Sequence, residues 1–241
     1  LESDKDSVTV AEISSFQLET MVTFKPHVTA ILNITPDHLD RHKTLENYIA
    51  IKESITKNQD ENDFCVLNYN DPVLREFGKT PRCKVIFFSS SEELESGVFL
   101  RGDTMIIKEN GVETPVCTTK DTSLVGMHNY ENIMAAIAMT HAMGVPLDTI
   151  RQGIKEFTAV EHRIEFVAEK NGVKYYNDSK GTNPDAAIKA VYAMPSPTIL
   201  IGGGYDKKSS YDEWVATFEG RVKELPVSYT HLRAHETCAD L

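Results

Sequence analysis

Strands that alternate with helices along most of the chain predict an α/β fold with mostly parallel sheets. Short runs rich in β-branched residues end in polar or glycine-containing turns, and amphipathic segments of helical length lie between them. The alternation restarts after a break near residues 158–161. The 241 residues are therefore expected to form two domains, at 1–159 and 160–226.

The first predicted domain contains both strands and helices. Val8 and Val10 predict a strand that leads into a helix beginning near Glu12. Asn110-Gly111 is a hairpin turn signal within the alternating stretch 97–117. The remaining expected strands are 28–34, 64–67 and 85–88, and the expected helices are 45–57, 129–143 and 147–157.

The second predicted domain begins with a hairpin and ends before an irregular tail. Strands at 164–168 and 173–176 flank Asn171-Gly172, and a helix at 184–192 precedes a strand at 198–201. Residues 227–241 show no periodicity and resemble a foreign tail, so they carry no functional inference. We reject a metal site at His231 and His235 for that reason.

Composition excludes several classes of protein. A formal net charge of -11 without a Lys/Arg cluster argues against a nucleic-acid binder. No apolar run is long enough to insert into a membrane. The four cysteines lack metal-type spacing, which favours reduced thiols in the cytoplasm. The first residues show no signal peptide and read like a chain cut within a domain.

Lys52 is the most informative single residue. A helical wheel places it in the apolar stripe formed by Leu45, Tyr48 and Ile49. A buried ammonium is costly unless it is paired or neutralised. One interpretation is a lysine whose stem packs while its head reaches water. The other is an amine that reacts with carbon dioxide, becomes an anionic carbamate and binds Mg²⁺.

Glu12 and His38 each follow an expected strand, at the edge where α/β proteins bind ligands. A carboxylate suits Mg²⁺, and an imidazole can also serve as a ligand. The alternatives are a helix-capping acid for Glu12 and an ordinary surface histidine for His38.

These residues lie in strings that resemble the Mur ligase family. The strings are Glu12-Ile-Ser-Ser-Phe-Gln-Leu-Glu19, Asn33-Ile-Thr-Pro-Asp-His-Leu-Asp-Arg41 and the helix that carries Lys52. The resemblance covers about residues 1–226. It implies a partial central ATP-binding domain followed by a truncated Rossmann-like domain. It also implies two Mg²⁺ ions positioned by Glu12, His38 and carbamylated Lys52. His38 and Lys52 would in addition be catalytic residues.

The first string is most similar to the branch that adds D-glutamate to UDP-N-acetylmuramoyl-L-alanine. The resemblance therefore implies an ATP-dependent, amide-forming ligase of peptidoglycan synthesis, and a role in cell shape and division. It implies those two substrates, a monomer and a cytoplasmic location. Ser14 and Gln17 would contact substrate.

Later strings extend the same resemblance. Gly126-Met-His-Asn-Tyr-Glu-Asn132 resembles the family's G-x-H-N-x-x-N element, in which Asn129 and Asn132 would reach adenine. Both residues could instead cap a helix. His162-Arg163 resembles a pair in which Arg163 clamps the nucleotide, with a surface salt bridge as the alternative.

Asn177–Asn183 lies between an expected strand and helix and matches the family's D-S-K-x-T-N element. Pro184 suits the first helical position and Asn183 the N-cap, which creates an anion site. By resemblance, Asp178 would contact the nucleotide. Lys180 and Thr182 would face the acyl phosphate and the incoming amino acid, and Lys180 would be a catalytic residue. Lys207, after Gly202-Gly203-Gly204, resembles a residue that holds the amino-acid carboxylate.

The phosphate-cradling loop G-x-x-x-x-G-K-S/T (the P-loop), which this family needs, does not occur in the 241 residues. We therefore expect this chain not to catalyse alone. The alternatives are a sister Mur ligase, a folylpolyglutamate synthase-like ligase, or a non-catalytic nucleotide-binding module.

Overall fold

The structure is a computed structural model that describes residue 4 and residues 7–36, 38–158, 161–204 and 210–227. The chain divides into two compact units. The first comprises Leu1–Val116 with Met134–Ile150, and the second comprises Cys117–Ile133 with Arg151–Leu241. The domains expected at 1–159 and 160–226 remain a prediction.

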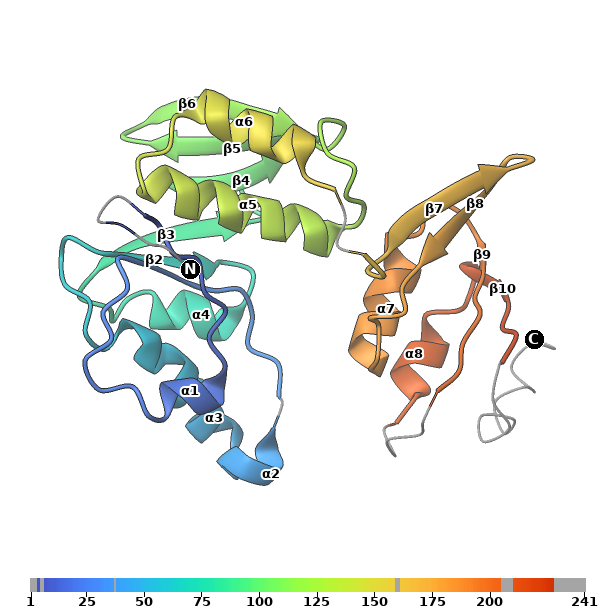
Figure 1. Cartoon of the computed structure of the whole chain (residues 1–241), viewed down its shortest axis with the longest axis horizontal. Coiled ribbons are helices and arrows are strands. Elements are labelled where there is room, and N and C mark those ends of the chain that lie inside the picture. Colours follow the sequence, from blue (N-terminus) through green and yellow to red (C-terminus); the bar gives the residue numbers. More distant parts are fainter. Residues whose placement is uncertain (1–3, 5–6, 37, 159–160, 205–209, 228–241) are drawn as a thin grey trace. The chain divides into compact units, whose positions relative to one another are not determined.

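A six-stranded sheet, in the order β1 to β6, organises the first unit (Figure 1). β1 to β4 run parallel, and β5 is antiparallel to β4. The mixed α/β class with a mostly parallel sheet is thereby confirmed. The strands are β1 (Val28–Ile31), β2 (Phe64–Asn68), β3 (Lys84–Ser89), β4 (Gly97–Arg101), β5 (Thr104–Glu109) and β6 (Val112–Thr118).

Apolar side chains cover both faces of the sheet, as is typical of parallel strands. Val66, Leu67, Phe88, Phe99 and Met105 are almost completely buried. On one side, Ile31, Cys65 and Leu67 pack with Leu74. The helices that accompany the sheet in sequence are α1 (Ser15–Leu18), α2 (Leu39–His42), α3 (Leu45–Glu53), the 3-10 turn η1 (Ser54–Thr56), α4 (Pro72–Phe77), α5 (Met127–Ala142) and α6 (Leu147–Glu156).

The second unit has two small sheets. β7 (Glu165–Lys170) and β8 (Val173–Asn177) form an antiparallel hairpin, and β9 (Thr198–Ile199) pairs in parallel with β10 (Val222–Glu224). α7 (Pro184–Ala193) packs against α8 (Asp212–Ala216). Val227 bridges Gly202 in parallel, while residues 228–241 of the predicted tail lie outside the described residues.

The strand expected at Val8 and Val10 is wrong. Residues 7–14 have no regular structure, and the side chains of Val8 and Val10 are 65% and 92% exposed. Two alternating valines do not make a strand unless a neighbour accepts and donates the ladder hydrogen bonds, and none of the described strands pairs with them. The helix expected to begin near Glu12 begins instead at Ser15.

Candidate functional site

The loop that follows β1 is anchored from two sides. The Ile34 amide donates to Oδ2 of Asp71 at 2.7 Å, and Asn68 Nδ2 donates to the Leu32 carbonyl at 3.1 Å. Asp71 is also the N-cap of α4, where its Oδ1 accepts from the amides of Val73 and Leu74. The loop therefore has a fixed position at the carboxyl ends of β1 and β2.

Lys52 lies at this loop. Its Nζ donates to the Asn33 carbonyl at 3.2 Å and lies 5.0 Å from the centre of the Tyr48 ring. The side chain is half-buried and its stem follows the buried Tyr48. The amine thus contacts both the loop after β1 and the Tyr48 ring, which belongs to the apolar stripe of the wheel. Its carbamylation and its role with His38 remain predictions.

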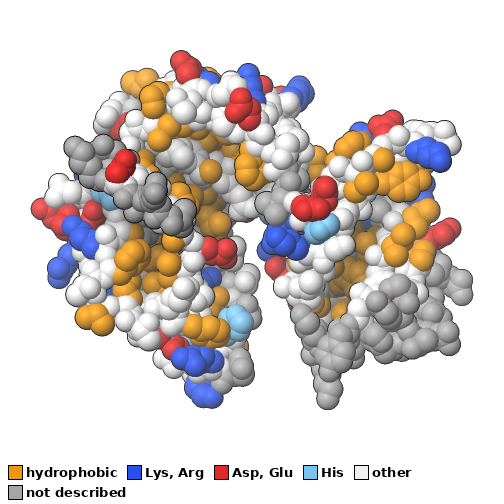
Figure 2. Space-filling model, in the orientation of Figure 1, with side chains coloured by type: hydrophobic (Ala, Val, Ile, Leu, Met, Phe, Trp, Pro, Cys, Tyr) orange, Lys and Arg blue, Asp and Glu red, His pale blue; other side chains and the backbone are white. Residues whose placement is uncertain are grey.

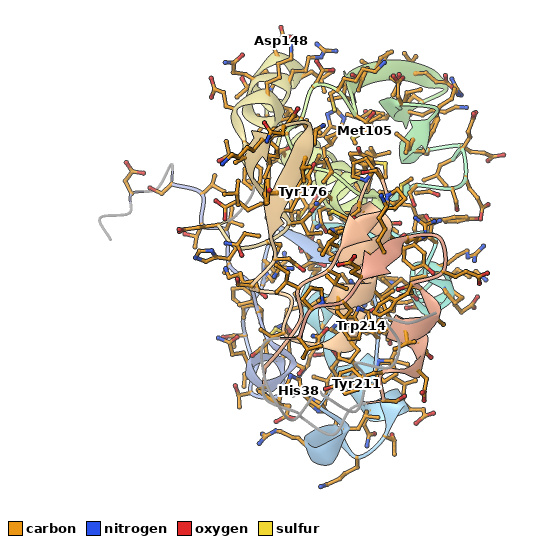
Figure 3. All side chains as sticks on the ribbon, turned by 90° about the vertical axis from the view of Figure 1, so that its right-hand side faces the viewer. His38, Met105, Asp148, Tyr176, Tyr211 and Trp214 are labelled. Carbon is orange, nitrogen blue, oxygen red and sulfur yellow. The ribbon has the colours of Figure 1, made fainter. Side chains whose placement is uncertain are left out.

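His38 and Glu12 are both exposed. His38 is the N-cap of α2 with a left-handed φ of 52°, and its ring centre lies 4.9 Å from that of Phe16 on α1 (His38 is labelled in Figure 3). Glu12 lies in the irregular segment before α1, whose N-cap is Ser14. The capping alternative for Glu12 is therefore wrong.

The donor set fits Mg²⁺ only if Lys52 is modified. Within the described part of the chain, no three His, Cys, Asp or Glu side chains cluster as a metal site. Glu12 offers a carboxylate and His38 an imidazole, but an ammonium at Lys52 would repel a cation. A carbamate there would supply the missing anionic oxygen.

Ser14 and Gln17 form the capping box of α1. The Gln17 amide donates to Ser14 Oγ at 3.3 Å, and the Ser14 amide donates to Gln17 Oε1 at 2.8 Å. This exchange satisfies two amides at the helix start. Substrate binding by these two side chains remains a prediction.

The element around Asn129 begins α5. Asn129 is buried and its Nδ2 donates to the Val125 carbonyl at 2.7 Å, so part of its amide serves the local fold. Asn132 is exposed. Burial, together with the positive charges of Lys189 and Arg163, lowers the pKa of the nearby His128. The charges of Lys189, which is paired with Asp185, and of Arg163 therefore act on His128, the residue before Asn129.

Asp178 holds a strained backbone. Its Oδ1 accepts from the Ile164 amide at 3.0 Å, and Ile164 has a φ of 44°, which is rare for a β-branched residue. A Cβ on Gly181 would collide with the Asp178 carboxylate, so the loop needs glycine there. Arg163 is exposed and its charge acts on Asp178. Lys180 and Thr182 are exposed on the same loop, while Lys207 lies outside the described residues.

The Asp178 carboxyl should make stability depend on pH. Burial raises the pKa of the Asp178 carboxyl, so this carboxyl binds a proton more tightly in the folded protein than in the unfolded chain. The free energy of unfolding should therefore fall as pH rises above about 4. Asp178→Asn, which keeps an oxygen for Ile164, should flatten that dependence in urea unfolding monitored by Trp214, the only tryptophan. Asp185→Asn, an exposed carboxylate paired with Lys189, controls for net charge; an equal flattening in that variant would contradict the assignment.

The N-terminus of α7 has the predicted cap. Asn183 Oδ1 accepts from the Ala186 amide at 2.8 Å, and Pro184 occupies the first turn. Asn183→Ala should lower the free energy of unfolding of this unit by about 1 kcal/mol, and Asn183→Ser should restore most of it. Trp214 fluorescence on α8, which packs against α7, measures both changes. Equal losses in the two variants would contradict a capping role.

Some residues at the site gave no recognisable signal in the sequence. Asp71 and His42 contact partners more than 20 residues away.

On the face drawn in Figure 2, the described Lys and Arg side chains do not gather into one broad field. No helix in the described ranges is long and apolar enough to cross a membrane.

An α/β sheet with polar loops at the ends of its strands defines a class of ligand-binding proteins. Comparisons with known proteins identify the family within that class. The family model for the Mur ligase middle domain matches residues 1–140. The chain belongs to the Mur ligase family.

Similar sequences bear the name UDP-N-acetylmuramoylalanine--D-glutamate ligase. The protein from Lachnoclostridium phytofermentans is 54% identical over 92% of this chain and 49% of its own length. That from Lachnospira eligens is 52% identical over 99% of this chain and 53% of its own length. The chain spans about half the length of the curated relatives it matches.

Solved structures share the fold at low sequence identity. A crystal structure of MurF from Acinetobacter baumannii has a TM-score of 0.68 and 18% identity, and covers 89% of this chain and 49% of the other. MurF from Thermotoga maritima in complex with ADP has a TM-score of 0.59 and 20% identity, with 89% and 50% covered. These similarities support the fold alone.

Proposed function

We propose that this chain is part of an ATP-dependent ligase that joins D-glutamate to UDP-N-acetylmuramoyl-L-alanine in peptidoglycan synthesis. The observation that carries the proposal is 54% identity, over 92% of the chain, with a ligase of that name. The fixed loop after β1, with Lys52 at 3.2 Å from Asn33, supports it.

The reaction would activate the substrate carboxylate by phosphoryl transfer from ATP. The D-glutamate amine attacks the acyl phosphate carbon and phosphate leaves from the tetrahedral intermediate, giving an amide, ADP and phosphate. Bound Mg²⁺ would offset charge on the phosphoryl group and the carboxylate. Glu12, His38 and carbamylated Lys52 would hold it.

The other predicted residues would bind the reactants. Asn129 and Asn132 would contact adenine, and Arg163 and Asp178 the rest of the nucleotide. Exposed Lys180 would stabilise negative charge that develops on the acyl phosphate. Ser14, Gln17, Thr182 and Lys207 would contact the substrates. We also propose that the enzyme is a cytoplasmic monomer.

An assay of phosphate release tests the proposal. In the complete enzyme that contains this chain, D-glutamate should stimulate phosphate release from ATP in the presence of UDP-N-acetylmuramoyl-L-alanine. Stimulation by another amino acid instead would indicate a sister ligase or a folylpolyglutamate synthase-like enzyme. A lack of ADP formation with any acceptor would indicate a non-catalytic nucleotide-binding module.

The isolated 241-residue chain should form no amide, because its sequence contains no P-loop to hold the triphosphate. Product analysis by mass spectrometry, beside the complete enzyme as the positive control, measures this directly. Amide formation by the chain alone would contradict the prediction.

A further inference from the structure

His42, at the end of α2, has a completely buried side chain with polar contacts to α1. Its Nε2 lies 3.0 Å from Ser15 Oγ, and its Nδ1 lies 3.3 Å from Oε1 of Glu19. The second pair is within ion-pair distance but is not aligned as a hydrogen bond. A buried imidazole with an incompletely satisfied nitrogen is a costly way to fill a core.

The His42 ring contacts aromatic residues from two other helices. The Phe16 ring of α1 stacks on His42 with centres 5.5 Å apart and an interplanar angle of 24°. The Tyr48 ring of α3 lies 5.4 Å from His42 at an angle of 43°. The His42 side chain therefore joins α1 and α3 to its own helix, α2.

Each of these three helices adjoins one predicted metal ligand. Glu12 precedes α1 by a few residues, His38 is the N-cap of α2, and Lys52 lies on α3 with its amine over the Tyr48 ring. Phe16 contacts both His38 and His42. A shift of His42 would consequently change the spacing of all three segments.

We propose that His42 is a positioning residue that fixes the relative places of Glu12, His38 and Lys52. The inference rests on the proposed function, which assigns those three side chains to a Mg²⁺ site. His42 does not touch the ion; it acts through Ser15, Phe16 and Tyr48. Residues of this kind orient the ligands that do bind a metal.

Three variants of the complete enzyme that contains this chain test the inference. His42→Gln removes the ring and its stacking, and Ser15→Ala removes only the Nε2 partner. His141→Gln is the matched control, because His141 lies on α5 and pairs with exposed Glu109 at 3.4 Å. Electron paramagnetic resonance of added Mn²⁺, in bicarbonate buffer, measures metal binding. Hydrogen exchange by mass spectrometry measures the local backbone.

His42→Gln should weaken Mn²⁺ binding by about 10- to 100-fold, and Ser15→Ala should weaken it in the same direction. Hydrogen exchange should rise in segments 14–20 and 38–48 and stay unchanged in β2 and β3. The control should match the unaltered enzyme in both measurements. If His42→Gln fails to fold, Ser15→Ala decides.

Unchanged Mn²⁺ binding, or faster exchange spread equally into β2 and β3, would overturn the inference. If the unaltered enzyme binds no Mn²⁺, the metal assignment in the proposed function fails instead. The role of His42 in holding the three segments would then be decided by the exchange result alone.

Discussion

Lys52→Ala is expected to lower the turnover of the complete enzyme about a thousandfold. A metal ion supplies several kcal/mol of charge stabilisation to such a transition state, and each 1.4 kcal/mol corresponds to a tenfold change in rate. The Lys52 amine lies 3.2 Å from the Asn33 carbonyl and 5.0 Å from the Tyr48 ring, so its loss removes a contact with the loop as well as the predicted metal ligand. Steady-state phosphate release measures the loss.

The control is Lys57→Ala, which removes an exposed lysine a few residues further along the same segment. This variant should keep the turnover of the unaltered enzyme. Full turnover in Lys52→Ala would contradict a role for the lysine in the reaction and would favour the alternative of a lysine that only packs its stem.

Chemical rescue separates a carbamate from a simple ammonium. If Lys52 acts as an anion, a short carboxylic acid added to Lys52→Ala should restore part of the turnover, and Lys52→Arg should remain inactive. Carbon-13-labelled bicarbonate should give a carbamate resonance in the unaltered protein that Lys52→Ala lacks. Rescue by a short amine, without that resonance, would identify the ammonium as the active form.

The sequence predicts local features of the fold well, because their causes lie within a few residues. Asn110-Gly111 and Asn171-Gly172 adopt the left-handed φ values that tight hairpins need. Asn183 caps α7 directly before Pro184. Each of these signals depends on one local residue, either an asparagine side chain or a glycine without one. Contacts with distant parts of the chain are therefore not needed to predict them.

Features that depend on distant partners could not be predicted in this way. Val8 and Val10 alternate as strand residues do, but strand formation depends on a neighbour in the sheet. The histidine at position 42 gives no sign that Ser15, 27 residues earlier, contacts its ring. Glu12, His38 and Lys52 could be named from their strings, but their relative positions depend on such contacts.

Asp71→Ala is expected to lower the free energy of unfolding of the first unit by about 2.5–4 kcal/mol. Loss of a helix cap costs about 1 kcal/mol, and loss of a hydrogen bond to a charged group costs about 1.5–3 kcal/mol. Asp71 combines both, because Oδ1 accepts from Val73 and Leu74 while Oδ2 accepts from Ile34. Circular dichroism during urea unfolding measures the change, and Trp214 fluorescence reports the second unit as an internal reference.

Asp71→Ser separates the two contributions. A serine can still cap α4, but its single short hydroxyl cannot bond both that helix and the Ile34 amide in the loop. We therefore expect Asp71→Ser to regain about 1 kcal/mol over Asp71→Ala while the Ile34 amide exchanges faster with solvent. Full stability in Asp71→Ser, with an unchanged Ile34 amide, would show that the loop keeps its position without Asp71. In that case the Asn33 carbonyl, and the Lys52 amine bonded to it, would be held by Asn68 and the β1 strand instead.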